Sequence, residues 1–382
     1  MKRGTIENSG TAEKAGTAEY TGSTGPGPAG ITRRLRIGFL SGIRHAVPYA
    51  ELLAENPLVE LIGVAEEAGV PEWMREDSRK AAAAVGIDYF DTLEPLLDPA
   101  AVDAVVVCSE PTRHAVLAVR ALDAGLHVLV DKPVGTGAAD VALLAAAQSS
   151  AAGTLAVVNR LQSPAVQRLR RWVDAGHMGL PLHVDVEWFA SGAHFATSVE
   201  RPELVVDRAL SGGGEILNFL LYPVDYIRYL TGLEVVEVHC EASTLFSGLH
   251  ADAGAEDTAV ASLLLENGVT ATVTLGRVPA APGLGPVSSS IRVLGSHGNA
   301  SADDDKPQVQ LFTTSGGVAA LPVDGPSSVA ILRRMFAGYV YDLLAGARPR
   351  YGLGDAAASL AVIEAAYVSA ASGQPARVAA AL

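Results

Sequence analysis

The feature that most constrains this chain is a regular alternation of apolar runs and amphipathic segments from residue 35 to residue 160. The apolar runs have the length of strands that are buried on both faces of a sheet: 35–40, 59–66, 102–109, 127–133 and 154–160. The segments between them carry helix-like patterns: 46–57, 78–86, 92–98, 113–125 and 137–151. Such an alternation predicts an α/β fold with a parallel, doubly wound sheet, which binds ligands at the carboxyl ends of its strands.

The pattern changes after about residue 160, where a helix at 163–176 precedes runs that alternate between apolar and polar residues. These runs predict half-exposed strands: 182–190, 235–243, 257–268, 270–278 and 289–296. Asn267 and Gly268, between two of them, are typical of a tight hairpin turn. We therefore expect a nucleotide-type domain at 34–160 and an α+β domain with an open, mostly antiparallel sheet at 161–382.

The N-terminal segment differs from both domains in composition. Residues 1–31 are rich in Gly, Thr, Ala and Glu and show no hydrophobic period, which predicts a disordered tail over 1–33. The stretch TRRLRIGFL resembles a twin-arginine export signal, but its apolar part is short and continues directly into the strand-helix-strand pattern. Cys108 and Cys240 lie far apart in apolar runs, as buried thiols of a reducing compartment do. We expect a cytoplasmic protein.

The charge balance limits the classes of partner. The 382 residues carry a formal net charge of -14, and no block of Lys or Arg interrupts it, which argues against nucleic acid and anionic membranes. No stretch approaches the roughly twenty apolar residues that a membrane-spanning helix needs. A small molecule is therefore the expected partner, with no membrane and no nucleic acid, and no motif indicates a metal site.

The turn after the first strand reads SGIRHA, where a dinucleotide-binding domain usually carries a set of glycines. The glycine positions hold Ser41, Ile43 and Ala46 here, so that Gly42 is the glycine left inside the turn. Serine and alanine are small enough to replace glycine, whereas the branched Ile43 keeps a phosphate further from the backbone. The candidate cofactor contacts are Ser41, Gly42, Ile43 and Arg44, and the alternative is a turn that binds nothing.

Later strand ends add candidate cofactor contacts. Glu66 closes the second strand, where an acid accepts hydrogen bonds from an adenosine ribose and repels a 2′-phosphate, so that NAD is favoured over NADP. The third strand ends in SEPTRH, which brings Ser109, Glu110 and His114 to the same edge of the sheet. The structural alternatives are a solvated glutamate beside Glu67 and a histidine that caps a helix.

The fourth strand ends on Asp131, Lys132 and Pro133. Most lysines are solvated surface charges. A lysine that ends a buried strand between an acid and a proline is partly desolvated, which lowers its pKa and lets it share a proton near neutral pH. Lys132 is therefore the leading catalytic candidate, with Asp131 beside it in the expected cofactor site.

The segment SGGGEILNFLLYPVDYIRYLTG, at 211–232, is the other informative stretch. Asn218, Tyr222 and Asp225 follow one another at i, i+4 and i+7, which places them on one face of a mostly apolar helix. Pro223 removes a backbone hydrogen bond and should kink or restart the helix beside Tyr222. The structural alternative is that the asparagine and the tyrosine satisfy each other inside a core.

Together, several segments resemble the Gfo/Idh/MocA family of sugar and cyclitol oxidoreductases: DAVVVCSEPTRHAVLAVRALDAGLHVLVDKPV, VVNRLQSPAVQRLRRWVDAGHMGLPLHV, GGGEILNFLLYPVD and AVIEAAYVSAASGQP. The resemblance runs from about residue 34 to residue 378. It implies a Rossmann domain that binds NAD(P), followed by a domain with an open sheet through which subunits often associate. It also implies a nicotinamide that faces the second domain.

The resemblance implies roles for the residues already singled out. Lys132 corresponds to the lysine of the family's Glu-Lys-Pro motif, with Asp131 in place of the glutamate, and the bond from Lys132 to Pro133 is a candidate cis peptide. Many members carry an aspartate and a catalytic histidine where this chain has Asn218 and Tyr222. A tyrosine is the proton donor in some branches of the family, so Tyr222 stays a catalytic candidate.

A further departure from the family lies at Leu161, where many members have an arginine. Asn159 and Arg160 stand directly before it and are candidate replacements. The substrate's hydroxyl groups are therefore expected to meet a polar set: Asn159, Arg160, Asn218 and Asp225.

These observations favour an NAD-dependent oxidoreductase that interconverts a secondary alcohol and a ketone on a sugar, a cyclitol or a related polyol. Tyr222, assisted by Lys132, would move the hydroxyl proton. Two alternatives stay open: a relative that uses NAD transiently to cleave a glycosidic bond, and a non-catalytic member that senses a nucleotide or a sugar. The residues Ile43, Asn218 and Tyr222 lend weight to the non-catalytic alternative.

Overall fold

The computed structural model describes residues 33–191, 201–278, 286–303, 308–313, 318–322 and 328–381. The expected tail at 1–33 falls almost entirely outside the described residues, so it stays a prediction.

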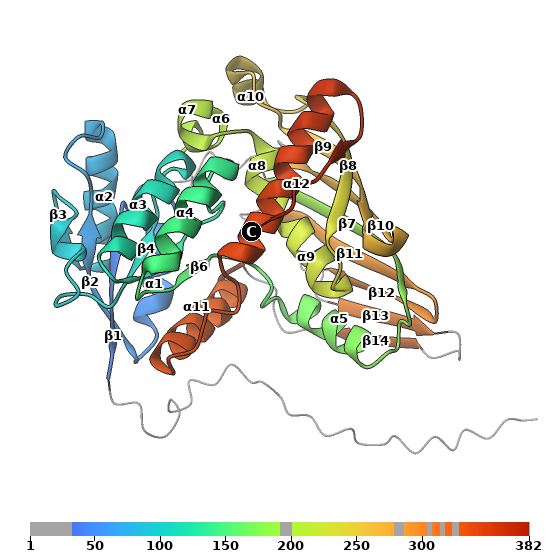
Figure 1. The fold of residues 1–382 in the computed structure, drawn as a ribbon, viewed down its shortest axis with the longest axis horizontal. Coiled ribbons are helices and arrows are strands. Elements are labelled where there is room, and N and C mark those ends of the chain that lie inside the picture. Colours follow the sequence, from blue (N-terminus) through green and yellow to red (C-terminus); the bar gives the residue numbers. More distant parts are fainter. Residues whose placement is uncertain are drawn as a thin grey trace, which may run out of the picture. The chain divides into compact units, whose positions relative to one another are not determined.

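The first part of the chain builds the expected parallel sheet, with strands in the order β3-β2-β1-β4-β5-β6 (Figure 1). All of its strand pairs are parallel. The strands are β1 Leu35–Leu40, β2 Val59–Ala65, β3 Asp88–Phe90, β4 Ala104–Val107, β5 His127–Val130 and β6 Leu155–Val157. The helices are α1 Ala46–Ala54, α2 Glu72–Val85, α3 Pro111–Asp123 and α4 Ala138–Ser150. This order reverses between β1 and β4, which is where such sheets bind their ligands.

The two faces of this sheet have separate cores. Ile37 and Phe39 of β1 pack with α1 and α2 on one face. Val105 of β4 and Val128 of β5 pack with α3 and α4 on the other. Both faces of the sheet are covered, so side chains on both sides of each strand are buried. This explains why the strands are continuous apolar runs in the sequence.

The boundaries differ from the prediction in a consistent way. The strands end earlier than expected, so that Glu66, Ser109 and Lys132 lie in the loops just beyond β2, β4 and β5. The helix expected at 78–86 begins at Glu72, directly after Pro71. The helix expected at 92–98 is only a 3₁₀ turn, Glu94–Leu96.

The second part of the chain builds a sheet of nine described strands in the order β14-β13-β12-β11-β7-β10-β9-β8-β15. β7 and β10 pair in parallel and their neighbours pair antiparallel, as expected for a mostly antiparallel sheet. The strands are β7 Pro181–Ser191, β8 Val235–Ser243, β9 Thr258–Leu265, β10 Thr270–Val278, β11 Pro286–Gly295, β12 Gly298–Asp303, β13 Gln308–Thr313, β14 Val318–Pro322 and β15 Ala376–Arg377. The sequence did not indicate β12 to β15.

The predicted hairpin turn joins β9 to β10. Asn267 and Gly268 both have positive φ, at 61° and 81°. Such angles suit a tight hairpin turn, and Asn and Gly adopt them most easily.

One face of the second sheet is covered by helices, and the other is open. Val186, Trp188 and Leu263 point into the covered face and are buried, whereas Val260 of β9 is 51% exposed. The helices of this part are α5 Pro164–Asp174, α6 Glu203–Val206, α7 Arg208–Ser211, α8 Glu215–Phe219, α9 Leu221–Thr231, α10 Gly248–Ala253 and α12 Leu353–Ser372.

A helix from the C-terminal part of the chain returns to the first sheet. Met335, Phe336 and Val340 of α11, Ser328–Leu344, pack into the core formed by β1 and α1. The first compact layer therefore includes residues far beyond 160, which the sequence pattern did not indicate.

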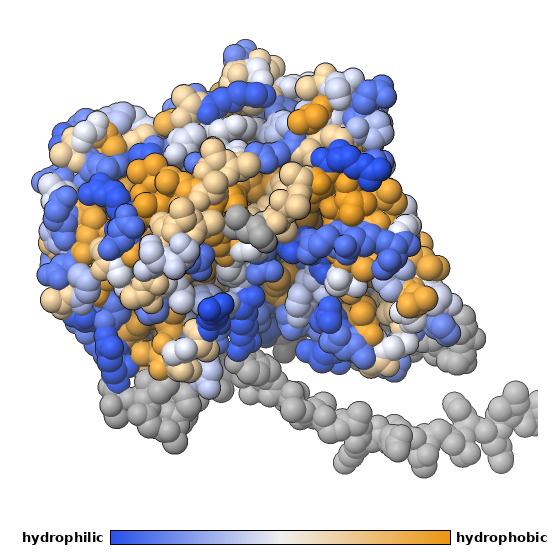
Figure 2. Space-filling model, viewed as in Figure 1, coloured by the Kyte–Doolittle hydropathy of each residue, from blue (hydrophilic) through white to orange (hydrophobic). Residues whose placement is uncertain are grey.

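Helix α12 departs from the expectation of no long apolar segment. Its 20 residues are apolar enough to cross a membrane by length and composition, but 67% of that stretch is buried inside the protein. Leu360 and Ile363 belong to the core shared with the second sheet. Apolar residues also gather over and beside α12 on the surface, interrupted by hydrophilic ones (Figure 2). The helix is long because it serves as the core element between the two parts.

The helix expected over 211–232 is broken in two. α8 ends at Phe219, Leu220 forms the junction and α9 begins at Leu221. Pro223 lies in the first turn of α9, where a missing backbone N–H removes no helical hydrogen bond. The restart beside Tyr222 was therefore expected, and it occurs at Leu221, one residue before the tyrosine.

Candidate functional site

The loops that follow the parallel strands converge at one edge of the first sheet. Ser41 follows β1, Glu66 follows β2, Ser109 follows β4 and Lys132 follows β5. All four side chains are buried. The carboxyl ends of the strands thus bring the predicted residues together, as the parallel topology requires.

Lys132 is the residue that joins the two parts of the chain. Its ammonium group is 4% exposed and donates to Asn218 twice, to the backbone oxygen at 3.1 Å and to Oδ1. Nζ also lies 5.5 Å from the ring centre of Phe219 and 5.4 Å from that of Tyr222, at cation–π range. The bond from Lys132 to Pro133 is cis, as the family resemblance implied.

Asn218 lies at the centre of the polar contacts. Its Oδ1 accepts from Lys132 and, at 2.9 Å, from Nη2 of Arg44. Its Nδ2 donates to Oε2 of Glu215 at 2.8 Å. The amide is therefore bonded on both sides, with donors at its oxygen and an acceptor at its nitrogen.

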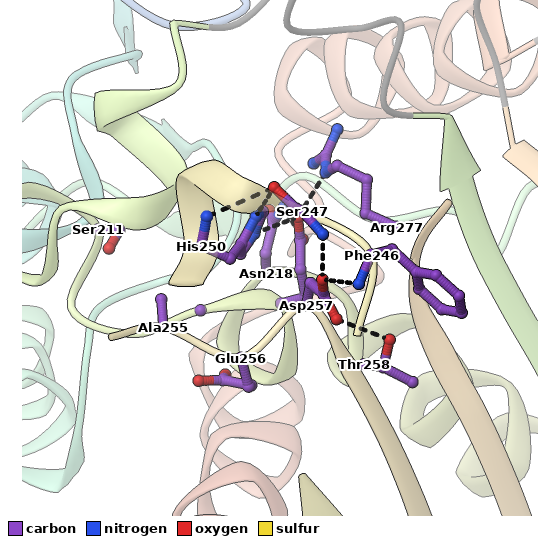
Figure 3. A network of polar contacts seen from close by, with 12 residues as sticks. Ser211, Asn218, Phe246, Ser247, His250, Ala255, Glu256, Asp257, Thr258 and Arg277 are labelled. Atoms are coloured by element: carbon purple, nitrogen blue, oxygen red, sulfur yellow. Dashed lines mark hydrogen bonds and ion pairs between the residues drawn. The ribbon is translucent and has the colours of Figure 1, made fainter. Parts of the chain in front are cut away.

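Glu215 is a functional candidate that the sequence analysis missed. Its fully buried carboxylate accepts from Nε of Arg277, lies 3.2 Å from Nε2 of His250 and accepts from Asn218. Burial opposes its ionisation, but the charge of Arg277 and the hydrogen bonds from its partners outweigh burial and lower the pKa of Glu215. In Figure 3 the side chains of Asn218, His250 and Arg277 point toward one another from α8, α10 and β10.

The ring of Tyr222 packs against an aromatic ring, Trp188, and a guanidinium group, Arg160. Its ring centre is 4.6 Å from that of Trp188 on β7. The guanidinium of Arg160 lies 5.0 Å from the ring centre of Trp188 and 5.8 Å from that of Tyr222. Arg160 and Tyr222, both predicted as site residues, are therefore close to Lys132, and Trp188 and Phe219 join them.

Asp131 holds the Lys132 loop in place. It accepts from Tyr49 Oη at 2.8 Å and from the backbone N–H of Lys132 at 2.8 Å, and it lies 2.7 Å from Nδ1 of His45. Burial raises the pKa of a carboxyl group, but the charge and hydrogen bond of His45 and the charge of Arg44 prevail and hold the pKa of Asp131 below its usual range.

His114 also holds the loop that carries Lys132. Nδ1 lies 2.6 Å from the carbonyl oxygen of Pro133, and Nε2 lies 2.9 Å from that of Ser109. Burial lowers the pKa of His114. The ring ties the loop after β4 to the loop after β5, whereas α3 has no side-chain cap, so His114 is not the helix cap given as the structural alternative.

Two predicted substrate contacts, Asn159 and Asp225, form hydrogen bonds with protein groups other than Lys132. Asn159 closes its own turn, because Nδ2 donates to Val157 O and Oδ1 accepts from Leu161 N, each at 3.1 Å. Asp225 Oδ1 accepts from Tyr351 at 2.7 Å and Ser359 at 2.5 Å. Asp225 is bonded to Ser359 on α12 and to Tyr351, two residues before that helix, whereas the ring of Tyr222 packs against Trp188 of β7.

A second set of contacts at the same edge of the sheet surrounds Glu66. Its Oε2 accepts from Ser41 Oγ at 2.6 Å and from Ser78 Oγ at 2.9 Å, and its Oε1 accepts from Arg113 Nη1 at 3.0 Å. Arg113 is also paired with Glu110 through Nε at 2.7 Å. Ser78 and Arg113 were not predicted as site residues. Both lie in the first two turns of their helices, α2 and α3, and so near the carboxyl edge of the sheet.

The residues at this edge fit a dinucleotide. Helix α1 follows the loop after β1. No described side chain caps its first turn, and the buried cation of Arg44 lies just before it. Helix N-termini of this kind bind pyrophosphate groups. Glu66 stands at the end of β2, where a carboxylate accepts from ribose hydroxyls. A Cβ on Gly42 would lie 3.0 Å from the backbone of Ser78, so any larger residue here would press on α2.

The same edge is covered by residues 201–211. Leu204 of α6 is fully buried against Ile43 and Met74. Arg201 donates from Nε to Asp77 at 2.6 Å and lies 4.7 Å from the ring centre of Trp73. Residues 201–211 therefore pack on the turn after β1 and on α2, beside the fully buried Glu66.

The described residues include no group of three or more His, Cys, Asp or Glu side chains that could hold a metal ion.

Comparison with known proteins identifies both parts of the chain. Residues 40–158 match the NAD-binding Rossmann fold of the GFO/IDH/MocA oxidoreductase family, and residues 166–301 match the C-terminal domain of that family. The chain is 29% identical to the uncharacterized oxidoreductase YrbE of Bacillus subtilis (strain 168), over 60% of this chain and 62% of the relative. It is 29% identical to the myo-inositol 2-dehydrogenase of Thermotoga maritima, over 64% of this chain and 70% of the relative. In fold it is similar to an aldose-aldose oxidoreductase from Caulobacter crescentus, with a TM-score of 0.73, 24% identity, and coverage of 90% of this chain and 100% of the other.

Proposed function

Because this chain belongs to the GFO/IDH/MocA family of NAD-binding oxidoreductases, we propose that it interconverts a secondary alcohol and a ketone on a cyclitol, a sugar or a related polyol. One observation carries the proposal. The ammonium group of Lys132, from the first part of the chain, meets Asn218 and Tyr222, from the second part, at the ligand-binding edge of the parallel sheet.

The substrate class follows from the relatives and from the polar side chains at the site. Relatives include inositol 2-dehydrogenases from Thermotoga maritima and Rhizobium meliloti, at 29% and 26% identity. Arg160 and Lys132 both lie beside the Tyr222 ring and can donate to the hydroxyl oxygens of a sugar or a cyclitol.

The chemistry divides between the cofactor and the protein. Bound NAD supplies the hydride acceptor. The protein's part is to bind the substrate hydroxyl and to move its proton. In the oxidative direction Tyr222 takes that proton as the phenolate and becomes the phenol, and in the reductive direction the phenol returns it; the Lys132 cation stabilises the negative charge on oxygen in both directions.

The choice of NAD over NADP rests on Glu66. A carboxylate at the end of β2 accepts hydrogen bonds from ribose hydroxyls and repels a 2′-phosphate. The pairing of Glu66 with Arg113 weakens that repulsion, so the preference for NAD is a quantity to measure.

Variants at Lys132 and Tyr222 test the proposal. Purified protein is assayed with NAD and a panel of inositols and sugars that includes myo-inositol, and NADH binding is measured by fluorescence. Lys132→Ala and Tyr222→Phe are expected to lower kcat by about 100-fold or more, the range of general acid–base contributions, while NADH still binds. Wild-type rates in both variants contradict the assignment.

The non-catalytic alternative is favoured by one observation, the cover of residues 201–211 over the cofactor edge. A sensing protein would bind NAD and change conformation without turnover. Retention of NADH together with no oxidation or reduction across the panel would select this alternative, and cleavage of glycosides without net NADH would select the glycosidase-like one.

We also propose a cytoplasmic, homo-oligomeric protein that associates through the open face of the second sheet. The location is supported by Cys108 and Cys240, which are both buried thiols. The association is supported by exposed apolar side chains on that sheet, among them Val260 and Leu294.

A further inference from the structure

We infer that Glu215 is a positioning residue of this site: its carboxylate fixes the amide of Asn218 so that Asn218 presents its oxygen, and not its NH₂ group, to Lys132. The importance of this for turnover rests on the proposed function. The geometric part of the inference does not, because it concerns only contacts within the protein.

The backbone places Glu215 firmly. It follows the run Gly212, Gly213 and Gly214, and its N–H donates to the backbone oxygen of Glu256 at 3.1 Å. A Cβ on Gly214 would lie 2.6 Å from that oxygen, so the chain must be glycine where it passes Glu256. The close approach sets the start of α8 and directs the Glu215 side chain into the interior.

A buried carboxylate is costly unless charges and hydrogen bonds compensate it. Arg277, on β10, is 2% exposed and bonds Oε1 of Glu215 through Nε. His250, on α10, is fully buried and lies 3.2 Å from the same oxygen. These partners occupy Oε1, and Oε2 accepts from Asn218.

Donor and acceptor types then leave one orientation for the Asn218 amide. A carboxylate only accepts, so the Asn218 NH₂ group faces Glu215. Lys132 and Arg44 only donate, so the Asn218 oxygen faces both cations. Rotating the amide by half a turn would set oxygen against oxygen on one side and donors against donors on the other.

The arrangement also balances charge around Lys132. The groups that face this cluster are Arg44 before α1, Arg277 on β10 and His250 on α10, with Arg160 across the Tyr222 ring. Glu215 is the anion bonded to the other side of the amide that Lys132 and Arg44 share. Removal of its charge therefore leaves these cations less compensated.

His250 is itself held by a surface loop. Its Nδ1 lies 2.7 Å from Ser247 Oγ, and the backbone N–H groups of Leu245, Phe246 and Ser247 donate to the carboxylate of Asp257 (Figure 3). This loop fixes the histidine that contacts Glu215, so the network extends from Lys132 to the loop at 244–256.

The test uses Glu215→Gln in the full chain. Arg277 still needs an oxygen from residue 215, so the new NH₂ group faces Asn218 and forces its amide to turn. Lys132 then loses an acceptor and a nearby anion, and both changes lower its pKa. Competitive acetylation with acetic anhydride across pH, read by mass spectrometry, reports the pKa of Lys132, with the exposed Lys80 of the same molecule as internal reference.

We expect a fall of at least one pH unit in the acetylation midpoint of Lys132, with Lys80 unchanged. The double variant Glu215→Gln with Asn218→Asp restores a donor–acceptor match and a carboxylate beside Lys132, so its midpoint should return to the wild-type value or above. Glu256→Gln is the matched control, because Glu256 is buried beside α8 and bonds Ile216 and Tyr367 but not Asn218.

An unchanged Lys132 midpoint in folded Glu215→Gln overturns the inference, and so does a fall of equal size in Glu256→Gln. Should Glu215→Gln not fold, Asn218→Leu carries the test, because it removes the amide and leaves Arg277 and His250 paired with Glu215. A smaller fall in the Lys132 midpoint is expected there, because the acceptor oxygen is lost while the Glu215 carboxylate remains, and no fall overturns the inference.

Failure of the proposed function gives a different result. Acetylation needs no turnover, so a protein that oxidises no polyol yet shows the Lys132 shift retains the inference and loses the function. In an active protein, Glu215→Gln should move the pH profile of kcat/KM in the same direction as the Lys132 midpoint and lower kcat more than it raises the KM for NAD.

Discussion

At the scale of the residue, Ser41 explains how a turn with few glycines still forms. Its φ is 65°, in the left-handed region that glycine usually supplies. That conformation costs a non-glycine residue roughly 1 kcal/mol. The hydrogen bond from Ser41 Oγ to Glu66, at 2.6 Å, offsets a cost of this size and joins the β1 turn to the end of β2.

The pairing of Glu66 with Arg113 leads to a prediction on cofactor choice. Glu66→Ser should weaken NADH binding about tenfold, because a carboxylate that accepts from ribose hydroxyls is lost. NADPH binding should improve, because Nη1 of Arg113 keeps its bond to Glu67 but loses the one to Glu66, so that it can also donate to a 2′-phosphate. Fluorescence titrations with both cofactors measure this, with Glu60→Gln, an exposed residue of β2, as control. Equal NADH affinity in wild type and Glu66→Ser would show that Glu66 does not contact the ribose.

The environment of Asp225 leads to a prediction on stability. Burial raises the pKa of Asp225 to about 7, against the hydrogen bonds of Ser359 and Tyr351, which lower it. The folded protein therefore binds this proton more tightly than the unfolded chain does. Its contribution to stability is complete below about pH 4 and is lost as the pH rises through 7.

Asp225→Asn removes that titration and keeps an oxygen for Tyr351 and Ser359. The Tm of the variant relative to wild type should rise by several °C between pH 5 and pH 8.5. Differential scanning fluorimetry across pH measures it, and the exposed Asp91→Asn serves as control. A Tm difference that does not change with pH would show that Asp225 is ionised throughout.

Single residues were predictable where topology decides their place. Lys132 and Glu66 end parallel strands, so the fold alone brings them to one edge. Asp225 could not be assigned from helical spacing, because its partners Tyr351 and Ser359 lie more than a hundred residues away. Glu215 carried a signal that was available: it stands three residues before Asn218, on the same face, and is charged in an apolar segment.

At the scale of the element, the short helices α6 and α7 differ most from the sequence expectation. Apolar side chains of this segment, such as Leu204, pack on Ile43 and Met74 of the first part of the chain. Thr112 on α3 donates to the carbonyl of Ala209 at 3.2 Å. No local pattern predicts such contacts, because a four-residue helix has too few positions to show a period.

The cover over the cofactor edge leads to a kinetic prediction. Arg201→Ala removes the bond to Asp77 and the stacking on Trp73, so residues 201–211 should move aside more often and NADH should associate several-fold faster. Stopped-flow fluorescence measures the association rate. Arg333→Ala is a matched control, because Arg333 makes an ion pair of the same 2.6 Å length with Glu55, away from the cofactor edge. Equal association rates in Arg201→Ala and wild type would show that this segment does not limit access.

Strands and helices were easier to predict where their pattern of apolar and polar residues was more regular. β1, β2, β4 and β5 and their helices followed from burial on both faces, and the β9–β10 hairpin followed from Asn267 and Gly268. β12 to β15 were missed because they are short, with two to six residues each, and a run of that length shows little period. α11 was missed, and even a helix pattern would not have said which sheet the helix packs on.

At the scale of the whole molecule, one continuous core joins the two sheets. It includes Val130 of the parallel sheet, Leu360 of α12 and Val186 of the second sheet. The site lies where these parts meet, so neither part alone holds both Lys132 and Tyr222. The sequence indicated both sheets, while the meeting point depended on the family resemblance.

The open face of the second sheet leads to a prediction on assembly. Val260→Lys places a charge on that face and should shift the protein toward monomers if subunits associate there. Size-exclusion chromatography with light scattering measures the mass. Leu143→Lys is the control, because Leu143 on α4 is similarly exposed but far from the second sheet in sequence and fold. A monomeric wild type, or an unchanged oligomer in Val260→Lys, would exclude this face as the interface.

The most direct test of the central claim is the turnover of the double variant Lys132→Ala with Tyr222→Phe, compared with both single variants. Residues that act on the same proton lose activity as a unit, so the account predicts that the double variant is at most a few-fold slower than the slower single variant. Losses that multiply across the two substitutions would contradict it, because they would mean that the lysine and the tyrosine act at separate places.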